Sequence, residues 1–479
     1  MAGRGIVLLL SVLFAASVGV CHGAAAAPGP GYVTVSTASF VTAGSASTCN
    51  SPDPVAAPTR NGTSAVLRLT HRHGPCAPSR TSSLATPSVA AILRADQRRA
   101  EYILNRVSGT GATKQQQQQP GDSKSAAAAT VPASWGYGIG TLNYVVTVSL
   151  GTPGVTQTLE MDTGSDLSWV QCAPCAAPSC YAQKDPLFDP AQSSTYAAVP
   201  CGGAACAGLG FYGDGSCTTQ CGYVVRYGDS SNTTGVYSSD TLALTPQDKV
   251  SSFFFGCGRA QAGLFTGIDG LMGLGRQSVS LVQQTVAAYG GAFSYCLPTT
   301  PTAAGYLTLG RPSTSGAAVA TTQLLSSPNA PFYYIVMMTG VSVGGKKLDV
   351  PRPVFAGGVV VDSGTVVTRL PPTAYAALRA AFRAAMAAYG YPTAPPTGIL
   401  DTCYNFTGYG SVTLPTVALA FGGGASVTLG GDGILSFGCL AFATTGGEDG
   451  GVAILGNVQQ RSFEVRFDAS SVGFKPNSC

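Results

Sequence analysis

Short runs of β-branched and aromatic residues, separated by glycine, proline and Asp-Ser turns, recur along the chain from about residue 135. Clear examples are residues 144–148 (YVVTV), 223–227 (YVVRY) and 333–337 (YYIVM). Such side chains favour strands, and the turn residues end each run after a few positions. This part of the chain is therefore predicted to be all-β, with a few short helices.

Two segments have a helical pattern instead. Residues 88–107 carry apolar side chains at roughly helical spacing, behind a Ser88 that can cap the first turn. Residues 373–389 are rich in alanine and place a large apolar side chain every four residues from Leu378 to Met386. The first is predicted to be an amphipathic helix, and the second is predicted to pack on a sheet.

The chain begins with the pattern of a secretory signal peptide over residues 1–23. Arg4 precedes an apolar run from Ile6 to Val20, and small residues near Gly23 suit cleavage there. The run is shorter than the roughly 20 apolar residues that span a membrane. We therefore expect export through the secretory pathway, to the cell exterior, the cell wall or a vacuole; an uncleaved anchor or an organelle-targeting segment is the alternative.

Residues 24–134 differ from the rest of the chain in composition and charge. They are rich in small and polar residues, include the tract Gln115–Gln119, and are predicted to be partly disordered linker around the first helix. They hold ten lysines and arginines against four acidic residues, whereas residues 135–479 hold fifteen against eighteen. This basic segment can dock on the acidic body and be released at low pH, or it can be a solvated linker with no regulatory role.

Cysteine and histidine usage narrows the chemistry. Twelve of the fifteen cysteines lie from Cys172 onward, an even number that predicts six disulfides in an exported protein. Two close spacings, Cys172 to Cys175 and Cys217 to Cys221, leave a zinc site as the lesser alternative. All three histidines precede residue 100, so a mature protein without residues 1–134 lacks a histidine for Ser-His-Asp or Cys-His catalysis.

A weak internal repeat organises the chain. The string MDTGS at 161–165 recurs as VDSGT at 361–365, and each is followed about a hundred residues later by an apolar pair before glycine, at 271–273 and 454–456. Paired markers of this kind predict two similar lobes, which we place at residues 135–325 and 326–479.

Each repeat offers one carboxylate, Asp162 in the first and Asp362 in the second. Hydroxyl and glycine neighbours allow a tight buried loop in which the carboxylate is hydrogen-bonded. These supporting residues are Thr163, Gly164, Ser165, Ser363, Gly364 and Thr365. If the two aspartates meet, they share one proton, and the pair can activate a water and polarise a peptide carbonyl without a metal or cofactor.

Five motifs together resemble the pepsin-like aspartic proteases, and in particular their plant nepenthesin-like branch. The resemblance covers about residues 140–479, and HRHGPC at 71–76 is similar to prosegments of that branch. The motifs are DTGSDLSWVQC (162–172), FGCG (255–258), GLMGLG (270–275), DSGT (362–365) and ILGN (454–457).

The resemblance implies a bilobal fold and a secreted, pepstatin-sensitive endopeptidase with an acidic optimum. It implies that Tyr227 and Gly228 lie on a flap over the substrate, that Trp169 steadies Tyr227, and that cleavage prefers apolar neighbours. It further implies a monomer, synthesised as a proenzyme with its prosegment as intramolecular inhibitor, that acts on protein or peptide substrates. A disulfide-stapled insertion between Cys172 and Cys221 and a Cys403–Cys439 bridge are also implied.

Two other functions remain open from the sequence. A catalytically silent binding or inhibitor protein can share this fold, because fold does not determine function. A nucleic-acid binder is disfavoured by the slightly acidic body. No membrane association is expected after signal cleavage. N-glycosylation sequons stand at Asn61, Asn232 and Asn405, with unknown occupancy.

Overall fold

A computed structural model describes residues 31–36, 64–71, 88–108, 143–175, 178–228, 230–263, 265, 267–299, 303–311, 318–461 and 463–476. The signal peptide, the Gln115–Gln119 tract, Asn61 and the expected end of the prosegment near residue 134 lie outside these ranges. Among the described residues, no helix combines the length and apolar character needed to cross a membrane.

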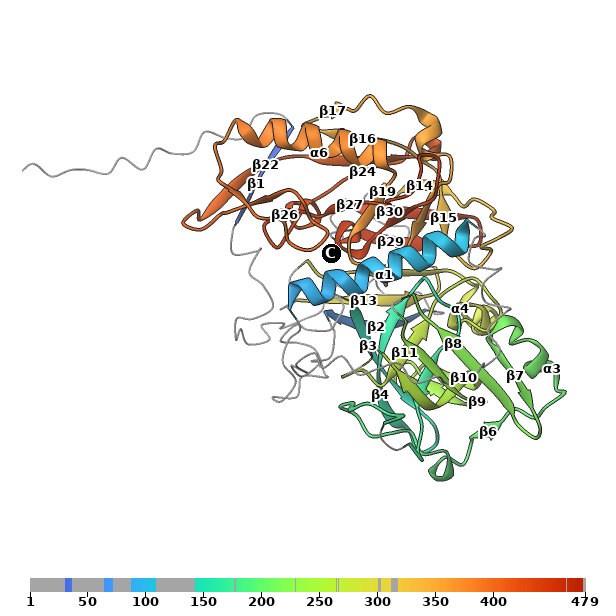
Figure 1. Cartoon of the computed structure of the whole chain (residues 1–479). Helices are drawn as coiled ribbons and strands as arrows, with labels where there is room; N and C mark the ends of the chain where they lie inside the picture. Colours follow the sequence, from blue (N-terminus) through green and yellow to red (C-terminus); the bar gives the residue numbers. More distant parts are fainter. Residues whose placement is uncertain are drawn as a thin grey trace, which may run out of the picture.

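The chain folds into two β lobes, as predicted (Figure 1). The largest sheet forms the first lobe and continues under the junction between the lobes. Its strands, in spatial order, are β14 (Ala320–Gln323), β30 (Ser471–Pro476), β29 (Phe463–Phe467), β12 (Phe293–Cys296), β13 (Ala304–Leu309), β2 (Ala65–His71), β3 (Tyr144–Leu150), β4 (Val155–Asp162), β11 (Gly270–Gly273), β5 (Trp169–Gln171), β10 (Lys249–Ala262), β9 (Asn232–Ala243), β8 (Cys221–Arg226) and β7 (Gly213–Cys217), with β6 (Ala197–Ala198) on β9.

Smaller sheets build the second lobe. One contains β15 (Ile335–Val336), β18 (Val359–Val361), β28 (Ala453–Leu455), β19 (Thr368–Leu370) and β27 (Phe442–Thr444). A second contains β17 (Lys346–Lys347), β16 (Met338–Val343), β23 (Val417–Phe421) and β24 (Ser426–Thr428). A third contains β20 (Thr393–Ala394), β21 (Cys403–Tyr404), β26 (Cys439–Leu440) and β25 (Leu435–Ser436), and β1 (Tyr32–Ser36) pairs with β22 (Ser411–Pro415).

Both predicted helices are confirmed. They are α1 (Val89–Val107), whose first turn is capped by Ser88, and α6 (Pro372–Ala387), which packs on β16 and buries Leu378 and Phe382. The other α-helices of the described residues are single turns: α3 (Ala204–Ala207), α4 (Leu281–Gln284), α5 (Val286–Tyr289) and α7 (Gly431–Ile434). The 3₁₀ helices are η2 (Pro190–Gln192), η3 (Gly210–Tyr212), η4 (Arg352–Phe355), η5 (Gly422–Gly424) and η6 (Asn457–Gln460).

The segment before residue 135 contributes more structure than its composition predicted. Strand β2 is inserted between β13 and β3, and β1 joins the second lobe through β22. Helix α1 lies along the junction between the lobes (Figure 1). Residues 24–134 are therefore not merely linker, because their described parts are integrated into both lobes and the space between them.

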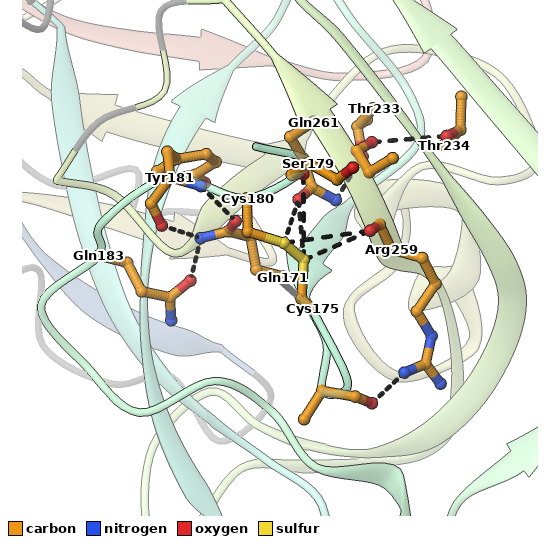
Figure 2. The surroundings of a disulfide bond; sticks show 12 residues. Gln171, Cys175, Ser179, Cys180, Tyr181, Gln183, Thr233, Thr234, Arg259 and Gln261 are labelled. Carbon is orange, nitrogen blue, oxygen red and sulfur yellow. Dashed lines mark hydrogen bonds between the residues drawn. A yellow bond between two sulfur atoms is a disulfide. The ribbon is translucent and has the colours of Figure 1, made fainter. Parts of the chain in front are cut away.

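Disulfides staple the first lobe as the resemblance implied. Three bridges lie within the Cys172–Cys221 stretch and one ties it to β10; they are Cys175–Cys180, Cys201–Cys217, Cys206–Cys221 and Cys172–Cys257. Figure 2 shows the Cys175–Cys180 bridge beside Gln261, with Gln171 hydrogen-bonded to Tyr181. The Cys403–Cys439 bridge of the second lobe is confirmed, and Cys479 lies outside the described residues.

Candidate active site

The internal repeat corresponds to two matching strand arrangements. Strand β4 ends at Asp162 and runs parallel to β11, which pairs antiparallel with β5. Strand β18 ends directly before Asp362 and runs parallel to β28, which pairs antiparallel with β19. The apolar pairs found in the sequence thus lie beside the two aspartate-bearing strands.

The glycine after each apolar pair has a steric reason. A Cβ on Gly273 would stand 2.1 Å from the backbone oxygen of Asp166, and one on Gly456 would stand 2.6 Å from that of Val366. Asp166 and Val366 each follow their aspartate by four residues. Only glycine lets each loop pass this close, so the same backbone crossing fixes both aspartates.

The structure brings the two aspartates together at the junction between the lobes, and both are fully buried. Each accepts a hydrogen bond from the glycine N–H two residues later, at 2.9 Å in Gly164 and 3.1 Å in Gly364. Each also accepts one from the hydroxyl three residues later, Ser165 (2.6 Å) or Thr365. The burial of the carboxylates is thereby compensated by local donors.

The middle residues of the two triplets lock the loops to one another. The backbone N–H of Thr163 donates to Ser363 Oγ (3.1 Å), and that of Ser363 donates to Thr163 Oγ1 (2.9 Å). Each hydroxyl then donates across the junction, to the carbonyl of Val361 or of Met161, both at 3.2 Å. Serine serves here as well as threonine because only the hydroxyl is used.

Tyr227 and Gly228, the residues expected on the flap, line the same pocket as Asp162. Tyr227 ends the β8 side of a hairpin, where its N–H donates to the carbonyl of Ser231 at 2.8 Å. Trp169 Nε1 donates to the Tyr227 hydroxyl at 2.7 Å. Burial, followed by the charge of Asp162, raises the pKa of Tyr227 well above its usual value, so the hydroxyl stays protonated. Asn232, a sequon residue, begins β9 just after this turn.

An arginine of α1 occupies the space between the aspartates. Arg99 Nη2 lies 2.6 Å from Asp162 Oδ1 and 2.8 Å from Asp362 Oδ1, and Arg99 Nε donates to Asp362 Oδ2 at 2.9 Å. Burial lowers the pKa of Arg99, but the two carboxylates outweigh it and raise that pKa well above the usual value. Burial acts to raise the pKa of the Asp362 carboxyl, but the charge and hydrogen bonds of Arg99 outweigh burial. The pKa of Asp362 therefore lies below its usual value.

Three further contacts hold α1 in the junction. Asp96 pairs with Arg369 at 2.8 Å, and the guanidinium of Arg106 lies 4.1 Å from the ring centre of Phe332. A Cβ on Gly228 would stand 2.2 Å from Tyr102 Cβ, so the flap backbone rests directly on the helix.

A small cavity of about 60 Å³ remains beside the helix. The second lobe, the flap and the helix all contribute to its lining, which includes Tyr333, Tyr227, Asp162, Arg99 and Arg106. With α1 in place, a peptide cannot reach the two aspartates, because Arg99 is hydrogen-bonded to Oδ1 of both Asp162 and Asp362.

Sequence reasoning missed Arg99, Asp96 and Asp166. The first two have a signal in hindsight, since they are charged residues close to the buried positions Ile92, Ala100 and Ile103 of an amphipathic helix.

Asp166 carries no comparable signal. Its carboxylate accepts hydrogen bonds from the N–H of Gln277 (2.9 Å) and the hydroxyl of Tyr212 (3.0 Å), and burial raises its pKa to about 6. It anchors the loop that follows β11.

Comparison with known proteins agrees with this architecture. Residues 144–311 match the family model described as xylanase inhibitor N-terminal, and residues 333–476 match the one described as xylanase inhibitor C-terminal. The fold is shared with solved structures of edgp (TM-score 0.57, 21% identity) and of basic 7S globulin from soybean (TM-score 0.55, 20% identity). Each match covers 70% of this chain, and 92% and 91% of those chains respectively.

Closer relatives match between 70% and 89% of this chain. An aspartyl protease family protein of Arabidopsis thaliana is 42% identical over 89% of this chain and 90% of its own length. Aspartyl protease AED1 from the same plant is 41% identical over 88% of each. Aspartic proteinase nepenthesin-2 of Nepenthes gracilis is 34% identical over 70% of this chain and 78% of its own. The chain therefore belongs to the pepsin-like aspartic proteases, in their nepenthesin-like branch.

Proposed function

We propose that this chain is a secreted aspartic endopeptidase, synthesised as a proenzyme and active as a monomer on protein or peptide substrates. One observation carries the proposal. Two equivalent, fully buried carboxylates, each supported by a hydroxyl and a backbone N–H, converge on a single nitrogen atom, Arg99 Nη2. In the mature enzyme the attacking water takes this central position.

The chemistry follows from the proximity of the two acids. Without Arg99, two carboxylates this close share one proton. The ionised partner takes a proton from the water, whose oxygen attacks the peptide carbonyl carbon while the protonated partner donates to the carbonyl oxygen. The tetrahedral intermediate collapses as the first carboxyl group donates its proton to the amide nitrogen, the second carboxylate takes a proton from a hydroxyl of the intermediate, and the C–N bond breaks, which restores the singly protonated dyad. Tyr227 and Gly228 cover the substrate from the flap.

The proenzyme part of the proposal is supported by α1. This helix places a cation against both acids and fills the cleft on which the flap closes. Its release at low pH removes Arg99 from the dyad. The signal-peptide pattern and the disulfides support secretion.

The second candidate is a catalytically silent binding or inhibitor protein. It is favoured by the description of both matching family models as xylanase inhibitor. Against it stand the paired loops, in which no carboxylate, hydroxyl or glycine has been lost.

Cleavage of denatured haemoglobin by the acid-treated full chain separates the two candidates. We expect cleavage by the wild type, loss of it in Asp162→Asn, and retention in Asp401→Asn, a control carboxylate that pairs with Arg379 on the outside of the second lobe. A wild-type chain that stays unprocessed and inert would favour the binding protein.

A further inference from the structure

A second carboxylate site adjoins the dyad and is occupied by α1 itself. Asp96 is 1% exposed, and its carboxylate accepts hydrogen bonds from the N–H groups of Val366 (2.5 Å) and Val367 (3.1 Å). It also forms the ion pair with Arg369 Nη2 at 2.8 Å. Val366 and Val367 directly follow the second aspartate loop, so this site belongs to the wall of the cleft.

Arg369 is held in place independently of Asp96. It lies on β19, is fully buried, and donates from Nη1 to the carbonyl of Val367 at 2.9 Å. Within the part of the chain that the structure describes, its Nε has no hydrogen-bond partner, and Asp96 is its one acidic partner. A buried guanidinium left without its carboxylate is strongly unfavourable, so this site favours another anion when Asp96 departs.

Removal of α1 in the mature enzyme, on which this inference rests as part of the proposed function, takes Asp96 away. The two N–H groups and the Arg369 guanidinium belong to the second lobe and stay behind. Leu400 and Val458, which pack with Leu93 of the helix, remain as the apolar side of the same site. The result is a cation with two aligned backbone donors, a geometry suited to a carboxylate.

We propose that Arg369, with the N–H groups of Val366 and Val367, forms a subsite for an acidic side chain of the substrate. Asp96 is the internal occupant of this subsite in the proenzyme, as Arg99 is the internal occupant of the dyad. The two residues are three positions apart, about 4.5 Å along a helix axis, so the acidic position lies within a few residues of the cut bond. Arg369 is thus a specificity-determining residue that contacts substrate.

Matched quenched peptides test the subsite in the acid-matured enzyme. A neutral parent peptide receives one glutamate, scanned over four positions on each side of the cut, and each peptide has a glutamine counterpart. At pH 5 glutamate is mostly ionised, since its ordinary pKa is about 4.3. We expect kcat/KM to favour glutamate about tenfold or more at one position, because hydrogen bonds to charged groups are the stronger class.

Variants assign the preference to Arg369. Arg369→Gln is expected to reduce the glutamate-to-glutamine ratio to about one, and Arg369→Lys to an intermediate value, because lysine keeps the charge and loses the planar fork. Arg379→Gln removes an arginine from α6 in the same lobe and is expected to keep the wild-type ratio. A parallel set of peptides that end in a free carboxylate at the same position distinguishes a terminal carboxylate from a side chain.

The outcomes separate this inference from the proposed function. Equal kcat/KM for the glutamate and glutamine peptides at every position would overturn the subsite and leave the proposed protease function standing. A wild-type preference that survives Arg369→Gln, or that appears only with terminal carboxylates, would also overturn it. Failure to cut any peptide would instead contradict the proposed function. If neither Arg369 variant folds, the glutamate-to-glutamine ratio of kcat/KM in the wild type decides: a ratio of about one at every position overturns the subsite, and a preference of about tenfold at one position supports it.

Discussion

Arg99→Gln removes the cation that holds the two aspartates in the closed chain. The substitution abolishes three charged hydrogen bonds to side chains that are fully buried. Breaking a buried ion pair costs about 3–5 kcal/mol, which corresponds to an increase of roughly 10²–10⁴-fold in the open population. The helix remains attached by Asp96 and its apolar face, so opening, and not global unfolding, is the expected result.

The pH dependence of opening has a definite sign. Arg99 lowers the pKa of Asp362 in the closed form below its usual value, so the ion pair favours closure at neutral pH. That contribution is lost as the pH falls through the lowered pKa and Asp362 takes up a proton. The wild type is therefore expected to open only in acid, and Arg99→Gln at a higher pH.

Hydrolysis of a quenched peptide immediately after a pH jump measures this opening. We expect Arg99→Gln to show activity near pH 6, where the wild type shows none, and to have a higher midpoint pH. Arg94→Gln removes the same charge from an exposed position of the same helix and should behave like the wild type. If Arg99→Gln stays as inactive as the wild type at pH 6 and keeps its midpoint, the inhibitory role of Arg99 is wrong.

Three other substitutions probe the flap, the pH response and the core. Trp169→Phe removes the 2.7 Å hydrogen bond to Tyr227 and should lower kcat/KM about tenfold in peptide assays, in line with about 1–1.5 kcal/mol for one hydrogen bond; an unchanged value would deny the flap contact. Burial raises the pKa of Asp269 to about 8, so its charge costs stability progressively as pH rises from about 4 to 8. In urea unfolding, Asp269→Asn should abolish this pH-dependent loss of stability. A variant whose free energy of unfolding falls with pH as steeply as that of the wild type would refute the assignment to Asp269. Phe382→Ala, at a fully buried position of α6, should lower the free energy of unfolding by about 3–5 kcal/mol in the same assay.

The sequence could predict those features that depend on local pattern or on repetition. The apolar spacing of residues 88–107 and 373–389 predicts α1 and α6, because a helix buries side chains at a fixed period. The repeated triplets predict Asp162 and Asp362 as a pair, because a duplicated lobe places equivalent loops at equivalent positions.

Contacts between distant segments could not be predicted in this way. Arg99 reaches Asp362 across 263 residues, and Asp96 reaches Arg369 across 273 residues. No periodicity links such partners, and the charges of α1 look like an ordinary polar face until the second lobe packs on them. Strand β2 was missed for the same reason, since its neighbours β13 and β3 come much later in the chain.

Catalysis by Asp162 and Asp362 is tested most directly by the intact mass of the purified chain over time after a shift from pH 7 to acid. The wild type is expected to lose its basic N-terminal segment, including Arg99, and then to cleave added peptide. Asp362→Asn is expected to retain that segment and to cleave nothing. An Asp362→Asn chain that matures and cleaves peptide at the wild-type rate would contradict catalysis by the two carboxylates.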